Sequence, residues 1–148
     1  MFMPRHDNII QRLLARDELV ACFIPDGIHI PPPVLKNFLR AKPRNRIVIT
    51  TDAVAAAGAP PGPFFMQRGK KMMRFVCDRK GMVALPGHSG YFFGSSLTLD
   101  KGVANISRWT EFSLETAWDW ASRRPAEILG IRLPRIDVPL SPEPIRAG

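Results

Sequence analysis

Two short apolar runs, LVACFI at residues 19–24 and RIVIT at residues 46–50, decide the fold of this chain. Each has the length of a strand and lacks polar alternation, which is typical of strands covered on both faces of a parallel sheet. Between them, VLKNFLRA at residues 34–41 places apolar residues at helical spacing, after prolines that a first helical turn tolerates. The order strand, helix, strand with short connections predicts a βαβ unit whose strands are parallel.

Polar residues follow both predicted strands. Asp26 and His29 come just after the first strand, and Asp52 comes just after the second. The carboxyl ends of parallel strands share one rim, and in α/β folds that rim carries the chemistry. Structural roles are open alternatives, because an aspartate such as Asp52 also serves as a helix cap or turn residue. A lone histidine such as His29 is more often structural or merely exposed than a ligand.

The remaining elements are predicted from periodicity and turn signals. A β excursion is expected over residues 64–85, with a turn at Asp78–Gly81, and residues 131–148 are rich in proline and predicted to be irregular. We therefore expect one unit over residues 1–130 and a tail over residues 131–148. Helices are expected in four further segments: residues 7–16 with Asp7 as the cap, a segment after Gly94 that contains Leu99, Val103 and Ile106, a segment capped by Ser113, and residues 125–129.

Composition excludes several classes. The 148 residues are 45% hydrophobic, as in globular proteins, and no apolar run approaches the roughly 20 residues of a membrane span. The N-terminus lacks a signal-peptide core, so cytoplasmic localisation is expected. Cys22 and Cys77 suggest neither a disulfide framework nor a zinc cluster. The net charge of +8 favours anionic partners, but the basic residues are dispersed, so neither nucleic acid nor membrane is expected as a partner.

Three motifs together carry a resemblance to a known family: IPDGIHIPP at residues 24–32, VITTDA at 48–53 and FGSSLTLD at 93–100, with AGAPPG at 57–62 between the last two. In order and spacing they resemble the last third of N-acetylglucosamine-6-phosphate deacetylases, which are amidohydrolases. The similarity runs from about Arg5 to Ile131. It implies an α/β fold, the C-terminal portion of a TIM-type (β/α)8 amidohydrolase barrel with a β-hairpin excursion.

The resemblance also implies roles for residues. Asp52 matches the aspartate that activates water as a general base and then protonates the leaving amine. His29 matches a substrate-contacting histidine, and Phe92, Phe93 and Gly94 match a loop that lines the sugar pocket. Arg5 corresponds to an arginine that binds the substrate phosphate across a subunit interface. The implied reaction is metal-dependent deacetylation of N-acetylglucosamine 6-phosphate to glucosamine 6-phosphate and acetate, with zinc or iron as the cofactor.

Departures from the family pattern shape these expectations. The family's metal ligands, a glutamate and two histidines, lie on earlier barrel strands, so no metal ligand is carried over to this sequence. Phe93 replaces a small residue, and the residues around Arg5 differ from the usual flank. We expect an incomplete barrel that is inactive alone and joins either further copies or a complementing N-terminal barrel fragment. The alternatives are another N-acyl amidohydrolase and a non-catalytic, partner-binding remnant.

Overall fold

The computed structural model describes residues 4, 6–88 and 91–133, which form a mixed α/β structure with a parallel strand pair and a separate antiparallel sheet. Arg5 and most of the predicted tail over residues 131–148 lie outside the described residues. In chain order the elements are α1 (Ile9–Leu14), β1 (Ala21–Phe23), α2 (Pro32–Ala41), the 3-10 turn η1 (Arg44–Arg46), β2 (Ile47–Ile49), β3 (Gly62–Arg68), β4 (Lys71–Cys77), β5 (Val83–Ala84), α3 (Leu99–Trp109), α4 (Leu114–Ala121) and α5 (Arg123–Ile128).

The predicted βαβ unit is confirmed. β1 and β2 are parallel, with Ala21 opposite Ile47 and Phe23 opposite Ile49, and α2 connects them. All three residues of β2 are buried, as its apolar run predicted. The expectation that β1 is covered on both faces is wrong at its centre, where Cys22 is exposed between two buried neighbours. One face of β1 packs on the helices, and no described element covers the other face at Cys22.

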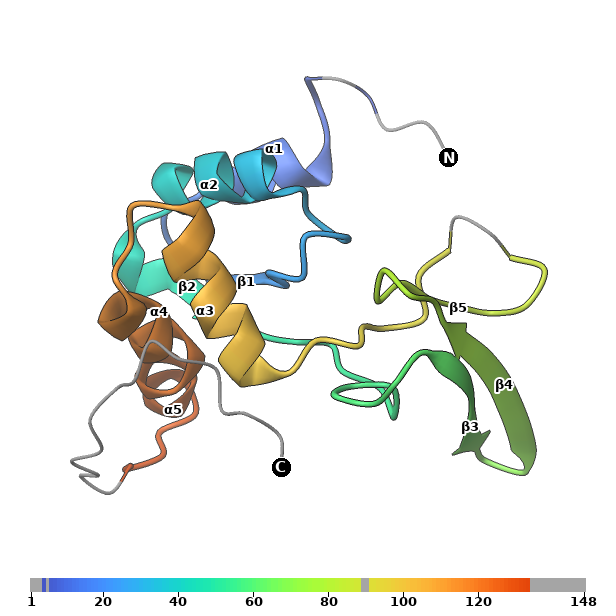
Figure 1. Ribbon diagram of the computed structural model, residues 1–148. Helices are drawn as coiled ribbons and strands as arrows, with labels where there is room; N and C mark the ends of the chain where they lie inside the picture. Colours follow the sequence, from blue (N-terminus) through green and yellow to red (C-terminus); the bar gives the residue numbers. More distant parts are fainter. Residues whose placement is uncertain (1–3, 5, 89–90, 134–148) are drawn as a thin grey trace.

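The main hydrophobic core lies between the parallel strands and the helices, which gather around β1 and β2 in Figure 1. Trp120 of α4 is its largest fully buried side chain, and its indole Nε1 donates to the carbonyl of Arg44 at 2.9 Å. Burying an apolar side chain of this kind stabilises a fold by about 1.5–3 kcal/mol. The buried members of this core are Ala21, Phe23, Leu35, Leu39, Ile47, Ile49, Val103, Ile106, Phe112, Ala117, Trp120 and Ala121.

Helix α1 is shorter than predicted and has a different cap. Asn8, not Asp7, occupies the N-cap, and its side chain accepts from the amide of Gln11 at 3.0 Å. Asp7 instead accepts two hydrogen bonds from the guanidinium of Arg12. Beyond the other end of α1, the buried ammonium of Lys42 donates to the carbonyls of Leu13 and Arg16 at 3.2 and 2.6 Å. The same two carbonyls accept longer bonds from the amides of Arg16 and Leu19, at 3.4 and 3.2 Å, so the ammonium adds a charged donor at the end of the helix where a cation is favoured.

The predicted β excursion is a three-stranded antiparallel sheet in the order β3, β4, β5 (Figure 1). The expected turn at Asp78–Gly81 joins β4 to β5. It is stabilised by the carboxylate of Asp78, which accepts from the amides of Lys80 and Met82. A second turn, at Gly69, joins β3 to β4 and was not predicted. The sheet contributes Phe75, Cys77 and Val83 to a second hydrophobic cluster, whose other buried member is Ala56 from the loop before the sheet.

The C-terminal helices match the sequence prediction closely. Ser113 caps α4 by accepting from the amide of Thr116 at 3.1 Å, and α5 is followed by Gly130 with a positive φ of 67°. Among the described residues, no helix is long and apolar enough to cross a membrane.

Candidate active site

Asp26 and His29 form a close pair in the loop after β1. The carboxylate Oδ2 of Asp26 lies 2.6 Å from the Nδ1 of His29. The other oxygen, Oδ1, accepts from the amides of Ile28 and His29, both at 2.8 Å, so the aspartate closes its own turn. The Asp26 side chain is 7% exposed and that of His29 is 18% exposed. The pair is therefore a nearly desolvated carboxylate and imidazole at the carboxyl end of a strand.

Other elements hold this loop in place. The side-chain amide of Asn105 in α3 donates to the carbonyl of Pro25 at 2.9 Å. Gly27 has a φ of 76°, and a Cβ there would lie 3.1 Å from the indole of Trp109, so a larger residue would meet both strain and crowding. The ring of Phe92 packs on the His29 ring, with centroids 4.4 Å apart. The position of the imidazole is thus defined from two sides.

Asp52 stands after β2 in an uncommon conformation. Thr50 and Thr51 separate it from the end of the strand, and its φ is +50°, the one positive φ among the described residues other than glycine. Aspartate tolerates this left-handed region better than most residues, and such conformations cluster at functional sites. The residue is exposed. Since β1 and β2 are parallel, Asp52 and the Asp26–His29 pair follow strands at the same end of the sheet.

Ser95 fixes the main chain around Asp52. Its amide donates to the carbonyl of Asp52 at 2.8 Å, its buried hydroxyl donates to the carbonyl of Thr51, and its carbonyl accepts from the amide of Val54 at 3.0 Å. Ala53 and Ser95 thereby form a parallel bridge. Gly94 makes this approach possible, because a Cβ there would lie 2.6 Å from Val54 and 2.8 Å from the carbonyl oxygen of Asp52.

The predicted loop residues separate into two environments. Phe92 is exposed and touches His29, whereas the Phe93 ring packs on Phe75 of the second cluster, with centroids 5.2 Å apart. Gly94 lies against Asp52, as described above. The roles of Phe92, Phe93 and Gly94 in binding a sugar stay predictions, as do those of Asp52 and His29. The predicted phosphate-binding residue Arg5 lies outside the described residues.

The resemblance implies a divalent metal, which would need a cluster of ligating side chains. Within residues 4, 6–88 and 91–133, no group of three or more His, Cys, Asp or Glu side chains could hold a metal ion. Catalytic metal sites use about three protein ligands. The described residues therefore do not fit such an ion by themselves.

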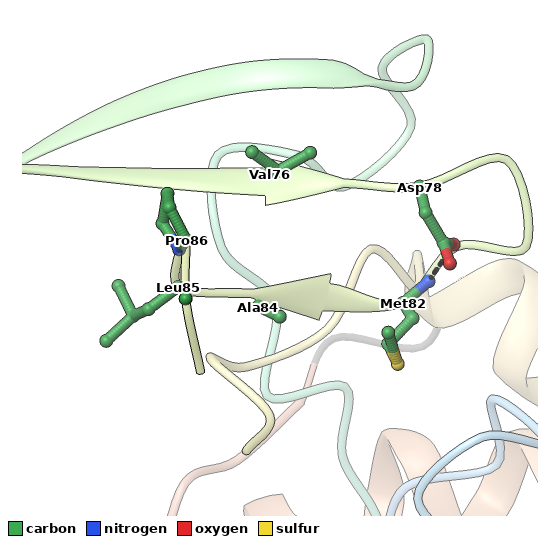
Figure 2. A pocket seen from close by; sticks show the side chains of 7 residues that line it. Val76, Asp78, Met82, Ala84, Leu85 and Pro86 are labelled. Atoms are coloured by element: carbon green, nitrogen blue, oxygen red, sulfur yellow. Dashed lines mark hydrogen bonds between the residues drawn. The ribbon is translucent and has the colours of Figure 1, made fainter. Parts of the chain in front are cut away.

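A shallow hollow on the antiparallel sheet is a weaker candidate site. Figure 2 shows its lining, which comes from β4, β5 and the turns that follow them. Its volume is about 200 Å³. The one charged group in it is Asp78, whose carboxylate already accepts two backbone amides. The side chains that line the hollow include no second polar group to act with Asp78, so the carboxyl ends of β1 and β2 remain the candidate site. Its lining residues are Val76, Asp78, Met82, Ala84, Leu85, Pro86 and Gly87.

Comparison with known proteins agrees with a hydrolytic α/β class, namely the amidohydrolases. No protein-family model matches the chain. The chain is 38% identical over 114 residues to the N-acetylglucosamine-6-phosphate deacetylase of Vibrio furnissii, covering 75% of the chain and 27% of the relative. It is 35% identical over 108 residues to the enzyme of that name from Danio rerio, covering 73% and 25%. Over about three quarters of its length the chain is therefore similar to N-acetylglucosamine-6-phosphate deacetylases, and it spans about a quarter of the length of these curated relatives.

Solved structures agree. An N-acetylglucosamine-6-phosphate deacetylase from Thermotoga maritima superposes with a TM-score of 0.70 at 26% identity, covering 83% of this chain and 32% of the other. A Mycobacterium smegmatis deacetylase, solved as a mutant with N-acetyl-D-glucosamine-6-phosphate bound, superposes with a TM-score of 0.73 at 20% identity, covering 87% and 34%. The second likeness shows the fold alone. Together they confirm the α/β architecture and the resemblance found in the sequence motifs.

Sequence reasoning missed two residues that hold the site together. Asp26 was noted at the rim without a role, although an aspartate followed by glycine and three residues before a histidine is a signal for a capped turn. Ser95 lies in the FGSSLTLD motif, but nothing in the sequence assigned it a role of its own. Its contacts with Thr51 and Val54 join segments on either side of the antiparallel sheet, so only the three-dimensional structure reveals them.

Proposed function

We propose that this chain forms the aspartate-bearing part of a deacetylase active site that hydrolyses N-acetylglucosamine 6-phosphate. One observation carries the proposal: the parallel pairing of β1 and β2 brings Asp52 and the Asp26–His29 pair to the same end of the sheet. The relatives from Vibrio furnissii and Danio rerio, whose names state this activity, support the choice of substrate. The two strands correspond in this proposal to the last two of a TIM-type barrel, within a unit of residues 1–130.

The proposed role of Asp52 is proton transfer. Hydrolysis of the N-acetyl group adds water across the amide carbon, breaks its C–N bond and releases acetate and an amine. A carboxylate suits both the attack of water and the departure of the amine, since Asp52 takes a proton from the attacking water and returns it to the leaving nitrogen. Its exposure after the strand end leaves it accessible to substrate. A left-handed φ held by Ser95 gives the residue a defined backbone position.

His29 is the proposed contact to the sugar, beside the ring of Phe92. Phe93 and Gly94 belong to the same loop, and Arg5 is the proposed phosphate contact. The zinc or iron implied by the family would take its ligands from outside the described residues, since these contain no group able to hold it. We therefore propose that the chain works with further barrel strands, contributed by an N-terminal barrel fragment or by assembly of copies, and is inactive alone.

A chimera tests this proposal. The matching 114-residue segment of the Vibrio furnissii relative would be replaced by the corresponding residues of this chain, and release of acetate from N-acetylglucosamine 6-phosphate would be measured. Turnover by the chimera, lost with Asp52→Asn and retained with Asp78→Asn, is the expected result. Asp78 is the matched control because it is a turn aspartate in the antiparallel sheet. A folded chimera without turnover would contradict the proposal.

A second substrate has specific support. The chain is 32% identical over 108 residues to the N-acetylgalactosamine-6-phosphate deacetylase of Escherichia coli O157:H7, covering 73% of the chain and 26% of the relative. The two sugars differ in one hydroxyl configuration, so the same chemistry serves both. Comparing kcat/KM for the two phosphates in the chimera decides between them.

A further inference from the structure

The Asp26 carboxylate uses both oxygens, and only one of them serves the turn. Oδ1 accepts two backbone amides, which already close the loop, while Oδ2 is directed at the His29 ring at 2.6 Å. A turn aspartate needs no imidazole partner: Asp78 accepts the amides of Lys80 and Met82 with one oxygen, and no hydrogen bond to a histidine is among its contacts in the described chain. The Asp26–His29 contact therefore calls for a separate explanation.

An ionised carboxylate only accepts hydrogen bonds. The Nδ1 that faces Asp26 must therefore carry a proton, and in a neutral imidazole the other nitrogen, Nε2, is then an acceptor. Phe92 packs on the ring at 4.4 Å and Asn105 anchors Pro25, so both the ring and the carboxylate are held. These contacts fix the direction of Nε2 as well as its protonation.

We propose that Asp26 is a positioning residue that keeps His29 in its Nδ1–H tautomer and presents Nε2 as a hydrogen-bond acceptor. The group that meets Nε2 is a donor, and on an N-acetylated sugar phosphate it is a hydroxyl or the amide N–H. This last step rests on the proposed function, whereas the tautomer follows from the contacts alone.

Asp26→Asn separates the two roles of the carboxylate, which are to close the turn and to accept from His29. The amide oxygen can still accept the amides of Ile28 and His29, so the turn keeps its closure. The amide nitrogen then takes the place of Oδ2, and because it donates, it requires Nδ1 of His29 to accept. His29 would switch to the Nε2–H tautomer, and the acceptor offered to substrate would become a donor. The same exchange at the serine-protease Asp–His pair leaves geometry intact and lowers kcat by about 10⁴ through the wrong tautomer.

The tautomer can be read directly by nitrogen NMR on the full chain. The chain contains 3 histidines, so ¹⁵N-histidine labelling gives few signals, and His29→Gln identifies those of His29. Solid-state measurement removes any dependence on particle size. At pH 8 we expect a protonated Nδ1 and a bare Nε2 in the native chain, the reverse in Asp26→Asn, and the native pattern in the control Asp78→Asn.

Two results would overturn the inference. One is an Nε2–H tautomer in the native chain, which needs no variant to fold. The other is an unchanged Nδ1–H tautomer in folded Asp26→Asn. The proposed function fails differently: if the chimera has no turnover while the native tautomer is Nδ1–H, the positioning role stands and the substrate assignment falls. If the chimera works, Asp26→Asn should lower kcat/KM at least 10-fold, and an unchanged kcat/KM would refute the role toward substrate.

Discussion

The amide of Ser95 donates to the carbonyl of Asp52 at 2.8 Å, joining the two ends of the chain segment that contains the antiparallel sheet. This bond gives the candidate catalytic residue a backbone position that does not depend on β2 alone. The excursion β3–β5 therefore affects the candidate site, since the segment that follows β5 supplies the contact to Asp52. It also approaches the rim directly, where the Ser96 hydroxyl donates to the carbonyl of Gly81 at 2.8 Å.

Asp52→Asn is expected to abolish most turnover in the chimera while leaving substrate binding close to normal. The amide is nearly the same size but cannot take a proton, and loss of general acid–base help costs about 10²–10⁴-fold in rate. Measuring kcat and KM separately checks this, with Asp78→Asn as the control. Turnover within a factor of two of the parent chimera would remove Asp52 from the mechanism.

Gly94→Ala should destabilise the chain and disturb Asp52. The residue has a φ of 66°, and a Cβ would lie 2.6 Å from Val54 and 2.8 Å from the Asp52 carbonyl. Gly69→Ala is the matched control, since Gly69 has a φ of 62° and nothing within 4 Å of a Cβ. Strain at a positive φ costs about 1–3 kcal/mol, so the free energy of unfolding should fall by that amount in both variants. It should fall further in Gly94→Ala, because only there does the new Cβ meet close neighbours. Equal losses in urea unfolding would show that the close approach has no consequence.

Lys42→Met is expected to lower the free energy of unfolding by about 1–3 kcal/mol, because it removes the charged donor from the carbonyl of Leu13 in the last turn of α1 and from that of Arg16 just beyond it. The ammonium donates to Leu13 and Arg16, and the side chain is 3% exposed. Lys36→Met is the control. Lys36 pairs with Glu111 at 3.6 Å while partly exposed, and such pairs contribute about 0–1 kcal/mol. Urea denaturation of the two variants measures the difference, and similar losses would contradict a capping role for Lys42.

Glu111 links α2 to the start of α4, and its contribution should depend on pH. The hydrogen bond from Arg40 holds the pKa of the Glu111 carboxyl below its ordinary value. A lowered pKa means that the ionised form is favoured by folding, so the stabilisation is present above the ordinary pKa of about 4.5 and is lost as pH falls through the folded-state value. Glu111→Gln should therefore lower Tm slightly at pH 7 and leave it unchanged at pH 2.5. A Tm difference that persists at pH 2.5 would exclude this origin.

The chain alone should associate in solution. β1 is paired with β2 along one edge, and within the described residues no strand pairs along its other edge. Phe65, Met72 and Leu129 are 62%, 66% and 70% exposed, which adds apolar surface. Light scattering after size-exclusion chromatography checks this prediction. A monodisperse monomer of 16.6 kDa would contradict it, and metal-dependent deacetylation by that monomer would also contradict the proposed inactivity of the chain alone.

Much of the fold follows from local sequence. Apolar runs without alternation predicted β1, β2 and their parallel pairing, and Ser113 correctly marked the start of α4. Where local signals compete, prediction failed: Asp7 and Asn8 are both good caps, and Asp7 pairs with Arg12 instead. The burial of β1 was overestimated, since an apolar run indicates what a strand can bury and not what surrounds Cys22.

The sequence by itself determined which residues follow the strand ends, because the hydrophobic pattern predicts the order strand, helix, strand and with it the parallel pairing. That pattern therefore predicts Asp26, His29 and Asp52 on one rim. Only the tertiary structure decided how they are held. Ser95 meets Asp52, and Phe92 meets His29, through contacts between segments far apart in the chain. Such contacts depend on how whole elements pack together. They cannot be predicted from periodicity, because periodicity relates only residues that are near neighbours in the sequence.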